Sequence, residues 1–460
     1  MRVEAANWNT CTLYSIFTNK HIFPLPSVNC HKFLQVTIES LYNIFIQHPS
    51  IQTDTRKLKQ GDLFFALKGP NFNGNLFALK ALEMGAAYSI VDEEIEGANE
   101  RIIKTDDVLT TLQNLAKYHR EQFNIPFVAI TGSNGKTTTK ELVNTVLAAH
   151  FKTYTTEGNL NNHIGIPITL LRVQKDAEIA VIEMGANHQK EIEGYCLYTQ
   201  PTHGIITNCG KAHLEGFGGI EGVRRGKGEL FDYIRVHNGT VFAYDDYDYL
   251  RDMSKNIQQI EWYGTRTGSI VGHALQSEPF LEVAFTKGVS FTSIKTQLVG
   301  DYNLPNVLCA VAVGKHFNVP DEKIKSAIEN YTPSNSRSQL IEKESNKIIL
   351  DAYNANPSSM KLAIENFAKL HATKKVLMLG GMMELGEESV QEHKNIIALI
   401  GSYKWNAVVL VGGDFGKIDH GYTFFNNSIE AAAWLQRQHF ENTYFLIKGS
   451  RSMAMEKVLV

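Results

Sequence analysis

Cysteine is scarce in this chain, and long apolar runs are missing. Its 460 residues include five scattered cysteines, none at paired spacing: Cys11, Cys30, Cys196, Cys209 and Cys309. This pattern argues against a disulfide framework or a zinc site and fits a reducing, cytoplasmic environment. No apolar stretch approaches the roughly 18 residues that a membrane span needs, so we expect no membrane insertion.

The chain also has little net charge. Its 45 basic and 48 acidic residues leave a formal charge of −3, which gives no electrostatic reason to expect nucleic-acid binding. Hydrophobic residues make up 43% of the chain and charged residues 20%, as in ordinary globular proteins. A chain of this length is expected to contain about two to four domains.

The sequence patterns predict an α/β protein of three domains. Residues 36–124 show a mixed α/β pattern, and residues 125–334 open with a strand, a loop and a helix before strands and helices alternate. Residues 335–460 repeat strand signals with helical patterns between them, which is typical of a second, Rossmann-like sheet. Residues 1–35 show no steady period. We expect them to be a non-native or disordered extension, and a packed arm is the alternative.

The stretch FVAITGSNGKTTTKELV, residues 127–143, is the most informative in the chain. Its apolar start predicts a buried parallel strand and its end a helix. The loop between them resembles a phosphate cradle, where an anion meets a helix N-terminus, although Gly132 lies only three residues before Gly135. An ordinary turn with a surface lysine is the alternative. The candidate phosphate-binding residues are Gly132, Ser133, Asn134, Gly135, Lys136, Thr137 and Thr138.

Other polar residues follow the predicted strands, where ligands of open α/β sheets gather. Glu183 ends the strand of IAVIEMG, and its carboxylate is an oxygen donor that suits Mg²⁺. His213, Lys227, Asn303 and Asn306 come later in the chain. Each has a plainer interpretation: a surface glutamate, a structural histidine, a lysine paired with Glu229, and helix caps for the asparagines.

Six motifs occur in an order that resembles the Mur ligases of peptidoglycan synthesis. They are TGSNGKTTTKE, TEGNLNNHIGIP, EMGANHQKEI, DAYNANPSSM, GGMMELGEES and KGSRSMAMEKV. The resemblance covers residues 36–460, and YNANP and MELGEES favour the branch that adds D-alanyl-D-alanine. It implies a UDP-binding N-terminal domain, a central P-loop ATPase with a parallel sheet, and a C-terminal Rossmann-like domain that closes over the centre.

The resemblance also implies roles for single residues. Lys136, Lys227 and His213 would be catalytic, and Lys227 would be carbamylated. Two Mg²⁺ ions would be held by Thr137, Glu183, His213 and Lys227. ATP would contact the loop residues 132–138 together with Asn303, Asn306, Arg337 and Asp351. The substrates UDP-MurNAc-tripeptide and D-Ala-D-Ala would contact Thr55, Arg56, Thr156, Asn159, Asn161, Asn162, Tyr353, Asn354 and Asn356.

Three positions depart from the family pattern. Tyr302 stands where a histidine is common, Gly381 where an aspartate is expected, and Asn75 where a histidine is common. The first position bears on the contact with the nucleotide base. The departures at Gly381 and Asn75 bear on the roles that the resemblance implies for the residues next to them.

The expected reaction is ATP-dependent ligation through an acyl phosphate, catalysed by a monomer in the bacterial cytoplasm. Another Mur ligase, such as the one that adds diaminopimelate or lysine, and a folylpolyglutamate synthase are alternatives of the same class. A nucleotide-dependent switch that ligates nothing is an alternative of a different class.

Overall fold

The computed structural model describes residues 36–334 and 336–460, and residues 36–460 form one compact unit. The extension predicted for residues 1–35 lies outside the described residues. Each of the three ranges predicted from the sequence contains one main sheet. The limits between the ranges remain a prediction.

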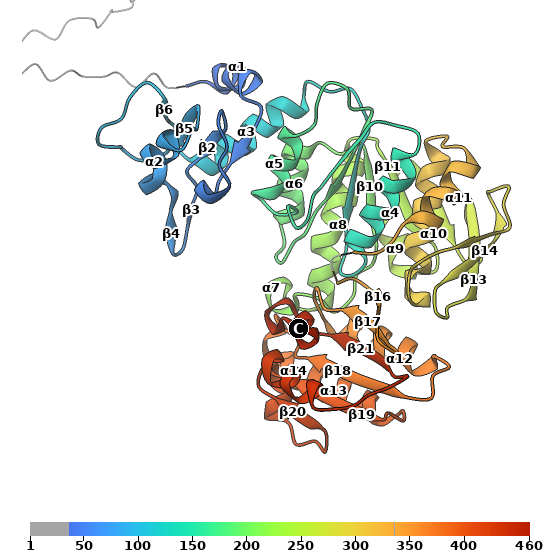
Figure 1. Cartoon of the computed structure of the whole chain (residues 1–460). Coiled ribbons are helices and arrows are strands. Elements are labelled where there is room, and N and C mark those ends of the chain that lie inside the picture. The colour runs from blue at the N-terminus through green and yellow to red at the C-terminus, as the bar shows by residue number, and fades with distance from the viewer. Residues whose placement is uncertain (1–35, 335) are drawn as a thin grey trace, which may run out of the picture. The chain divides into compact units, whose positions relative to one another are not determined.

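The N-terminal range, blue in Figure 1, is built on a small parallel sheet of order β1-β2-β5-β6. Its strands are β1 (Ile51–Gln52), β2 (Leu63–Phe65), β5 (Tyr88–Val91) and β6 (Ile102–Lys104), and a hairpin joins β3 (Lys68–Gly69) to β4 (Phe72–Asn73). The helices are α1 (Ile38–Gln47), α2 (Ala78–Glu83) and α3 (Val108–Arg120). Helix α1 begins after Thr37, whose hydroxyl accepts a hydrogen bond from the Ser40 amide.

The central range contains a nine-stranded sheet of order β15-β14-β13-β12-β11-β10-β7-β9-β8. Neighbouring strands from β8 to β13 in that order pair in parallel, and the β13–β14 and β14–β15 pairs are antiparallel. The strands are β7 (Phe127–Thr131), β8 (Thr153–Thr155), β9 (Ile179–Glu183), β10 (His203–Ile206), β11 (Thr240–Tyr244), β12 (Gln259–Gly264), β13 (Ile270–Gln276), β14 (Glu282–Lys287) and β15 (Ser293–Lys295). Strands β14 and β15 form an antiparallel hairpin whose turn includes Gly288.

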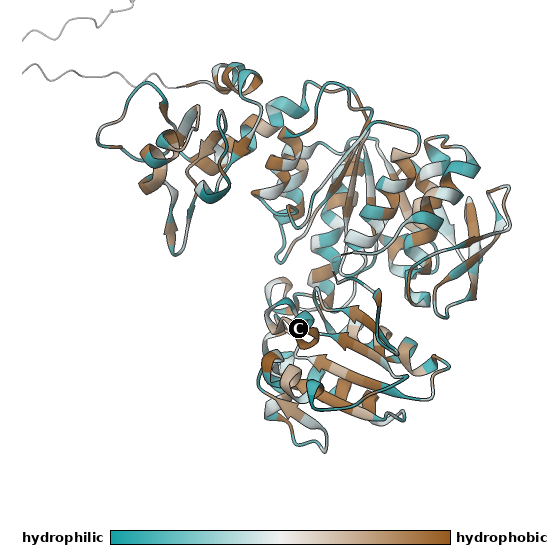
Figure 2. Cartoon of the chain, viewed as in Figure 1, coloured by the Kyte–Doolittle hydropathy of each residue, from teal (hydrophilic) through white to brown (hydrophobic). Residues whose placement is uncertain are grey.

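Helices of the central range follow its strands (Figure 1). They are α4 (Lys136–Ala148), α5 (Gly165–Leu171), α6 (Glu191–Thr199), α7 (Leu214–Phe217), α8 (Ile220–Val236), α9 (Asp248–Met253), α10 (Leu304–His316) and α11 (Asp321–Asn330). Every residue of β7, β9 and β11 is buried. These strands are apolar except at their ends, as expected where helices cover both faces of a parallel sheet, and hydrophobic residues are brown in Figure 2.

The C-terminal range, orange to red in Figure 1, holds a six-stranded sheet of order β16-β17-β21-β18-β19-β20. Its strands are β16 (Gln339–Lys343), β17 (Asn346–Asp351), β18 (Lys375–Gly380), β19 (Ala407–Val411), β20 (Thr423–Phe425) and β21 (Tyr444–Lys448). Its α-helices are α12 (Pro357–Lys369), α13 (Ser389–Gly401) and α14 (Ser428–Gln436). Only the β16–β17 pair is antiparallel in this sheet, which confirms the predicted Rossmann-like α/β arrangement.

Gly381, one of the three departures, follows β18 at a point where two backbone segments nearly touch. A Cβ atom on Gly381 would lie 2.7 Å from the Gly413 Cα. Gly412 and Gly413 both have a φ of 59°, in the left-handed region that glycine adopts most easily. The missing side chain at position 381 therefore permits the close approach of the loop after β19.

Replacing Gly381 with alanine is expected to lower the free energy of unfolding by about 1–3 kcal/mol, because the added methyl must displace backbone. Gly401→Ala is a matched control, since its Cβ would meet its nearest neighbour at an ordinary 3.7 Å. Urea unfolding of the two variants compares them. Equal stability of Gly381→Ala and the unchanged protein would show that the loop moves aside freely.

Candidate active site

A cavity of about 690 Å³ lies at the carboxyl ends of β7 and β9 and beside the start of α10. It brings together most of the residues predicted for the nucleotide, from the loop before α4 to Asn303, Asn306, Arg337 and Asp351. Because carboxyl ends of parallel strands meet at one edge, residues far apart in sequence share this cavity.

The predicted phosphate loop, residues 132–138, is shaped by two glycines. Gly132 has a φ of 143° and Gly135 a φ of 76°, and Gly135 directly precedes α4. A Cβ on Gly132 would overlap the Thr207 hydroxyl, and a Cβ on Gly135 would lie 2.8 Å from Asn306 Oδ1. Asn208 holds the loop, since its carbonyl accepts from the Ser133 amide at 2.9 Å and its side chain from the Asn134 amide at 3.0 Å.

Lys136 turns back over the loop that precedes it. Its Nζ donates to the Gly132 carbonyl at 2.7 Å and to the Ser133 carbonyl at 3.3 Å. Burial lowers the pKa of Lys136 to about 8, the nearby Glu183 carboxylate opposes that shift, and Arg337 adds to it. Carbonyl oxygens are weak partners for an ammonium group, so a phosphate would be a stronger one.

Glu183 is buried with one carboxylate oxygen unpaired. Asn161 Nδ2 donates to Glu183 Oε1 at 2.8 Å, and the Glu183 amide donates to the Thr156 hydroxyl at 2.9 Å. Glu183 Oε2 is buried and has no hydrogen-bond partner. A buried charged oxygen without a partner is costly, and a hard cation such as Mg²⁺ would satisfy it.

Lys227 is 1% exposed and lies on α8. Its Nζ donates to the Ala186 carbonyl at 2.8 Å and lies 4.9 Å from the Phe217 ring centroid. Burial, reinforced by the charge of Lys136, lowers the pKa of Lys227 to about 7. Glu229 is engaged elsewhere, since its carboxylate accepts from the amides of Lys190 and Glu193. The lysine–glutamate pair considered from the sequence is therefore wrong.

His213 contacts a residue of the C-terminal range. Its Nδ1 lies 2.5 Å from Glu384 Oε2, and the side-chain hydrogen bond lowers the pKa of Glu384. His213 lines the same cavity as Glu183. No group of three or more His, Cys, Asp or Glu side chains suited to a metal occurs among the described residues. The role of His213 as a metal ligand stays a prediction.

The two asparagines predicted to contact ATP, Asn303 and Asn306, already make hydrogen bonds within the protein. Thr139 Oγ1 donates to Asn306 Oδ1 at 3.0 Å, and Asn306 Nδ2 donates to Asn303 Oδ1 at 2.9 Å. Asn303 Nδ2 donates to the Val299 carbonyl at 2.9 Å. Each amide nitrogen keeps one further N–H for a ligand.

Tyr302, another of the three departures from the family pattern, contacts the C-terminal range. Its hydroxyl lies 2.9 Å from Ser338 Oγ, and the Ser338 amide donates to Asp351 Oδ1 at 3.2 Å. The guanidinium of Arg337 stacks 3.6 Å from the centroid of the Tyr353 ring. These contacts place Arg337, Asp351 and Tyr353 along one wall of the cavity.

Of the residues predicted to bind the substrates, some line the cavity and others do not. Asn161, Asn162, Tyr353, Asn354 and Asn356 line the cavity, and Asn356 Nδ2 donates to Asn134 Oδ1 at 2.7 Å. The other predicted substrate residues, Thr55, Arg56, Thr156 and Asn159, are not among its lining residues. The Arg56 side chain is 87% exposed and pairs with Asp54 at 2.8 Å.

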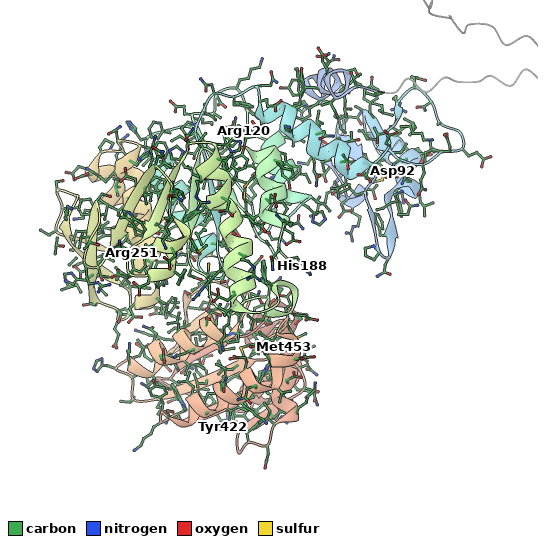
Figure 3. All side chains as sticks on the ribbon, turned by 180° about the vertical axis from the view of Figure 1, so that it is seen from behind. Asp92, Arg120, His188, Arg251, Tyr422 and Met453 are labelled. Carbon is green, nitrogen blue, oxygen red and sulfur yellow. The ribbon has the colours of Figure 1, made fainter. Side chains whose placement is uncertain are left out.

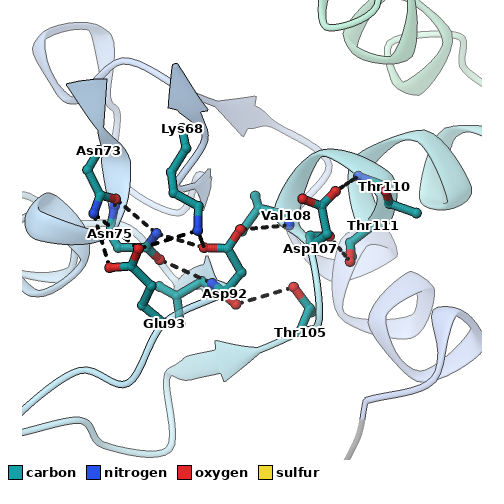
Figure 4. A network of polar contacts seen from close by, with 11 residues as sticks. Lys68, Asn73, Asn75, Asp92, Glu93, Thr105, Asp107, Val108, Thr110 and Thr111 are labelled. Carbon is teal, nitrogen blue, oxygen red and sulfur yellow. Dashed lines mark hydrogen bonds and ion pairs between the residues drawn. The ribbon is translucent and has the colours of Figure 1, made fainter. Parts of the chain in front are cut away.

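Asn75, the third departure, belongs to a polar network near the β3–β4 hairpin (Figure 4). Its Nδ2 donates to Asp92 Oδ1 at 2.8 Å, and its Oδ1 accepts from the Asp92 amide at 3.1 Å. Lys68 Nζ lies 3.0 Å from the same carboxylate. Asn75 is 2% exposed, so this residue fastens the hairpin to the end of β5.

Several lining residues are missing from the sequence-based set. Lys448 is 2% exposed, ends β21 and donates to Asp351 Oδ2 at 2.5 Å. It ends the strand YFLIK, and ligands of open α/β sheets gather at the carboxyl ends of strands. This position could therefore have identified Lys448 from the sequence. Tyr244, the last residue of β11, also lines the cavity, as do Asp246 and Tyr247 just after that strand. Glu384 lies in the motif GGMMELGEES, but its contact with His213 has no local signal, and neither has the contact of Ser338 with Tyr302, because the partners are distant in the sequence.

Family models match three parts of the chain. The Mur ligase middle domain matches residues 130–314, the glutamate ligase domain residues 336–451, and the catalytic domain of the Mur ligase family residues 49–120.

Two curated relatives carry the same name, UDP-N-acetylmuramoyl-tripeptide–D-alanyl-D-alanine ligase. The one from Bacillus subtilis is 34% identical over 89% of this chain and 92% of its own. The one from Haemophilus influenzae is 32% identical over 95% of this chain and 97% of its own.

Solved structures show the same architecture. MurF from Acinetobacter baumannii aligns with a TM-score of 0.81 and 31% identity, over 89% of this chain and 92% of its own. MurF ligase from Thermotoga maritima in complex with ADP aligns with a TM-score of 0.80 and 26% identity, over 89% of this chain and 96% of its own. Similarity along nearly the whole described chain shows that the protein belongs to the Mur ligase family.

Proposed function

We propose that this chain joins D-alanyl-D-alanine to UDP-N-acetylmuramoyl-tripeptide at the expense of ATP, giving the pentapeptide precursor of peptidoglycan. The observation that carries the proposal is a phosphate loop that shares one cavity with Glu183, a buried carboxylate with an unpaired oxygen. The names of the full-length relatives supply the substrates.

The chemistry needs a carboxylate made reactive toward an amine. A carboxylate oxygen of the tripeptide attacks the γ-phosphorus of ATP, the bond to ADP breaks, and an acyl phosphate forms. The amine of D-Ala-D-Ala then attacks the acyl carbon, phosphate leaves, and the amine loses its proton. The first step brings anions together, and Lys136 and Arg337 supply positive charge beside them.

Glu183 and Thr137 suit a divalent cation on the triphosphate, because both line the cavity and offer oxygen donors. A bound Mg²⁺ neutralises phosphate charge. We further propose that Lys227 carries a carbamate, which would turn a buried cation into an anionic oxygen donor for a second ion. His213, which lines the cavity, would complete that environment.

The substrates would approach from different parts of the chain. Tyr353, Asn354 and Asn356 line the cavity and would shape the D-Ala-D-Ala end. Residues 36–124, with Thr55 and Arg56, would hold the uridine diphosphate, residues 125–334 the ATP, and residues 335–460 the incoming dipeptide. No helix among the described residues is long and apolar enough to cross a bilayer. We propose a cytoplasmic monomer, in keeping with the free cysteines 196, 209 and 309.

Phosphate release measured with and without each substrate tests the reaction. Release should require both UDP-MurNAc-tripeptide and D-Ala-D-Ala, and mass spectrometry should find the pentapeptide. Turnover with diaminopimelate or lysine and the corresponding dipeptide precursor would favour another Mur ligase, and turnover with a folate and glutamate would favour the synthase. Release that needs no acceptor would favour a switch.

Lys136→Ala should lower turnover by about a thousandfold or more, since a charged contact to the reacting phosphates is lost in the transition state. Thermal unfolding of the variant should be near that of the unchanged protein, because Lys136 Nζ bonds loop carbonyls alone. Lys152→Ala, which removes a 59%-exposed lysine side chain, is the control. Near-normal turnover of Lys136→Ala would contradict the assignment of the phosphate loop.

Lys227 should form a carbamate in the presence of bicarbonate. Its pKa of about 7 is below that of an ordinary lysine, so the neutral amine that attacks CO₂ becomes more abundant as the pH rises from 6 to 8. A ¹³C NMR carbamate signal after labelling with ¹³C-bicarbonate should grow over that range and vanish in Lys227→Ala. Acetate should partly restore the activity of that variant.

Lys190→Ala is the control for this labelling, because Lys190 pairs with Glu193 at the surface. It should keep the full signal. A signal of equal size in Lys227→Ala would place the carbamate elsewhere, and full activity of that variant would exclude a catalytic role.

A further inference from the structure

A second cavity, of about 680 Å³, lies at the amino ends of β10 and β11, the opposite ends of these strands from the nucleotide cavity. Its lining includes His203 at the start of β10, His316 at the end of α10, and Arg120, which Figure 3 labels. None of its lining residues takes part in the mechanism above.

Two imidazole nitrogens converge in this cavity. His203 Nε2 lies 3.2 Å from His316 Nε2. Two bonds of about 2.0–2.1 Å to one metal ion, at a tetrahedral angle, hold their nitrogens about 3.3 Å apart. The pair therefore already has the spacing of two ligands on a single ion.

The outer nitrogens of both rings have polar partners. His316 Nδ1 lies 3.4 Å from Glu261 Oε1, and His203 Nδ1 lies 2.8 Å from Thr202 Oγ1. Metal-binding histidines commonly donate their second N–H to a carboxylate or another oxygen, which fixes the ring and the tautomer. Both rings also pack against Phe242 and Phe317, which restrict their rotation.

We propose that His203 and His316 form a binding site for one late transition-metal dication, of the class of Zn²⁺ or Cu²⁺. Imidazole nitrogen suits these ions, whereas Mg²⁺ prefers oxygen. Among the described residues, no third His, Cys, Asp or Glu joins the pair. Water from the cavity supplies the remaining ligands.

The hydrogen bonds let a cation replace the proton between the rings. Glu261 can accept but not donate, so His316 Nδ1 carries a proton and His316 Nε2 offers a lone pair. Without metal, His203 Nε2–H donates to that lone pair and the Thr202 hydroxyl donates to His203 Nδ1. With metal, His203 shifts its proton to Nδ1, and the Thr202 hydroxyl turns to the Phe127 carbonyl, 3.2 Å away. No hydrogen bond of Thr202 is lost.

Charge also favours a cation at this place. His316 is the last residue of α10 (Leu304–His316), and the C-terminal end of a helix carries partial negative charge. The Glu261 carboxylate adds to it. The positive charge of Arg120 disfavours a cation here. This charge is partly offset, since Arg120 Nε, Nη1 and Nη2 each donate to a backbone carbonyl. Burial, together with His316, lowers the pKa of His203 to about 4, so the ring is neutral at pH 7.

Titration of the full chain with Zn²⁺ by calorimetry, in excess Mg²⁺ at pH 7.5, tests the site. His203→Gln and His316→Gln should each remove one bound Zn²⁺ per chain or weaken it at least tenfold. Glu261→Gln should weaken binding by about 10-fold or more through the lost carboxylate. His237→Gln is the matched control: it lines the same cavity, but its Nδ1 bonds the Tyr233 carbonyl and its ring stacks on Tyr233.

Electron paramagnetic resonance of the Cu²⁺-loaded protein gives a signature that folding defects do not imitate. The unchanged protein and the His237→Gln control should show hyperfine coupling to two equivalent imidazole nitrogens, and His203→Gln and His316→Gln should each show coupling to one. Zn²⁺ binding by the unchanged protein that is no tighter than by His316→Gln would overturn the proposal. So would a Cu²⁺ spectrum without coupling to two nitrogens.

Discussion

The close approach of the phosphate loop to its neighbours is the constraint on which the nucleotide cavity depends. Neither Gly132 nor Gly135 has space for a side chain, because the Thr207 hydroxyl and the Asn306 amide occupy it. The loop is thereby pressed between the end of β10 and the start of α10.

The compact packing of the site also removes charged side chains from water. Lys136, Lys227, Glu183 and Lys448 are wholly or partly removed from water, where an unpaired charge is costly. Lys448 is paired with Asp351, whereas Lys136 and Lys227 bond carbonyl oxygens and Glu183 keeps an unpaired oxygen. The groups that remain poorly paired are those next to the phosphate loop, which is where anionic phosphates and their cations would satisfy them.

The sequence predicts the parts of the fold and site that depend on local pattern. Buried parallel strands such as Phe127–Thr131 and the strand–loop–helix of the cradle are confirmed, and so is the Mur ligase family. Contacts between distant residues were not predictable in this way. Glu384 meets His213, and Ser338 meets Tyr302, because of how segments more than 30 residues apart pack. The local sequence around either residue does not indicate which distant residue it contacts.

Helix α10 connects the two cavities of the central range. Its first turn carries Asn306 at the nucleotide cavity, and its last residue, His316, lies in the second cavity. Ten residues separate them, which is about 15 Å along a helix. Residues 306–314 are buried, so the helix is clamped along its length and its two ends are fixed in relation to each other. The dipole of this one helix favours an anion at one cavity and a cation at the other, because its partial positive end lies beside Gly135 of the predicted phosphate loop and its partial negative end carries His316.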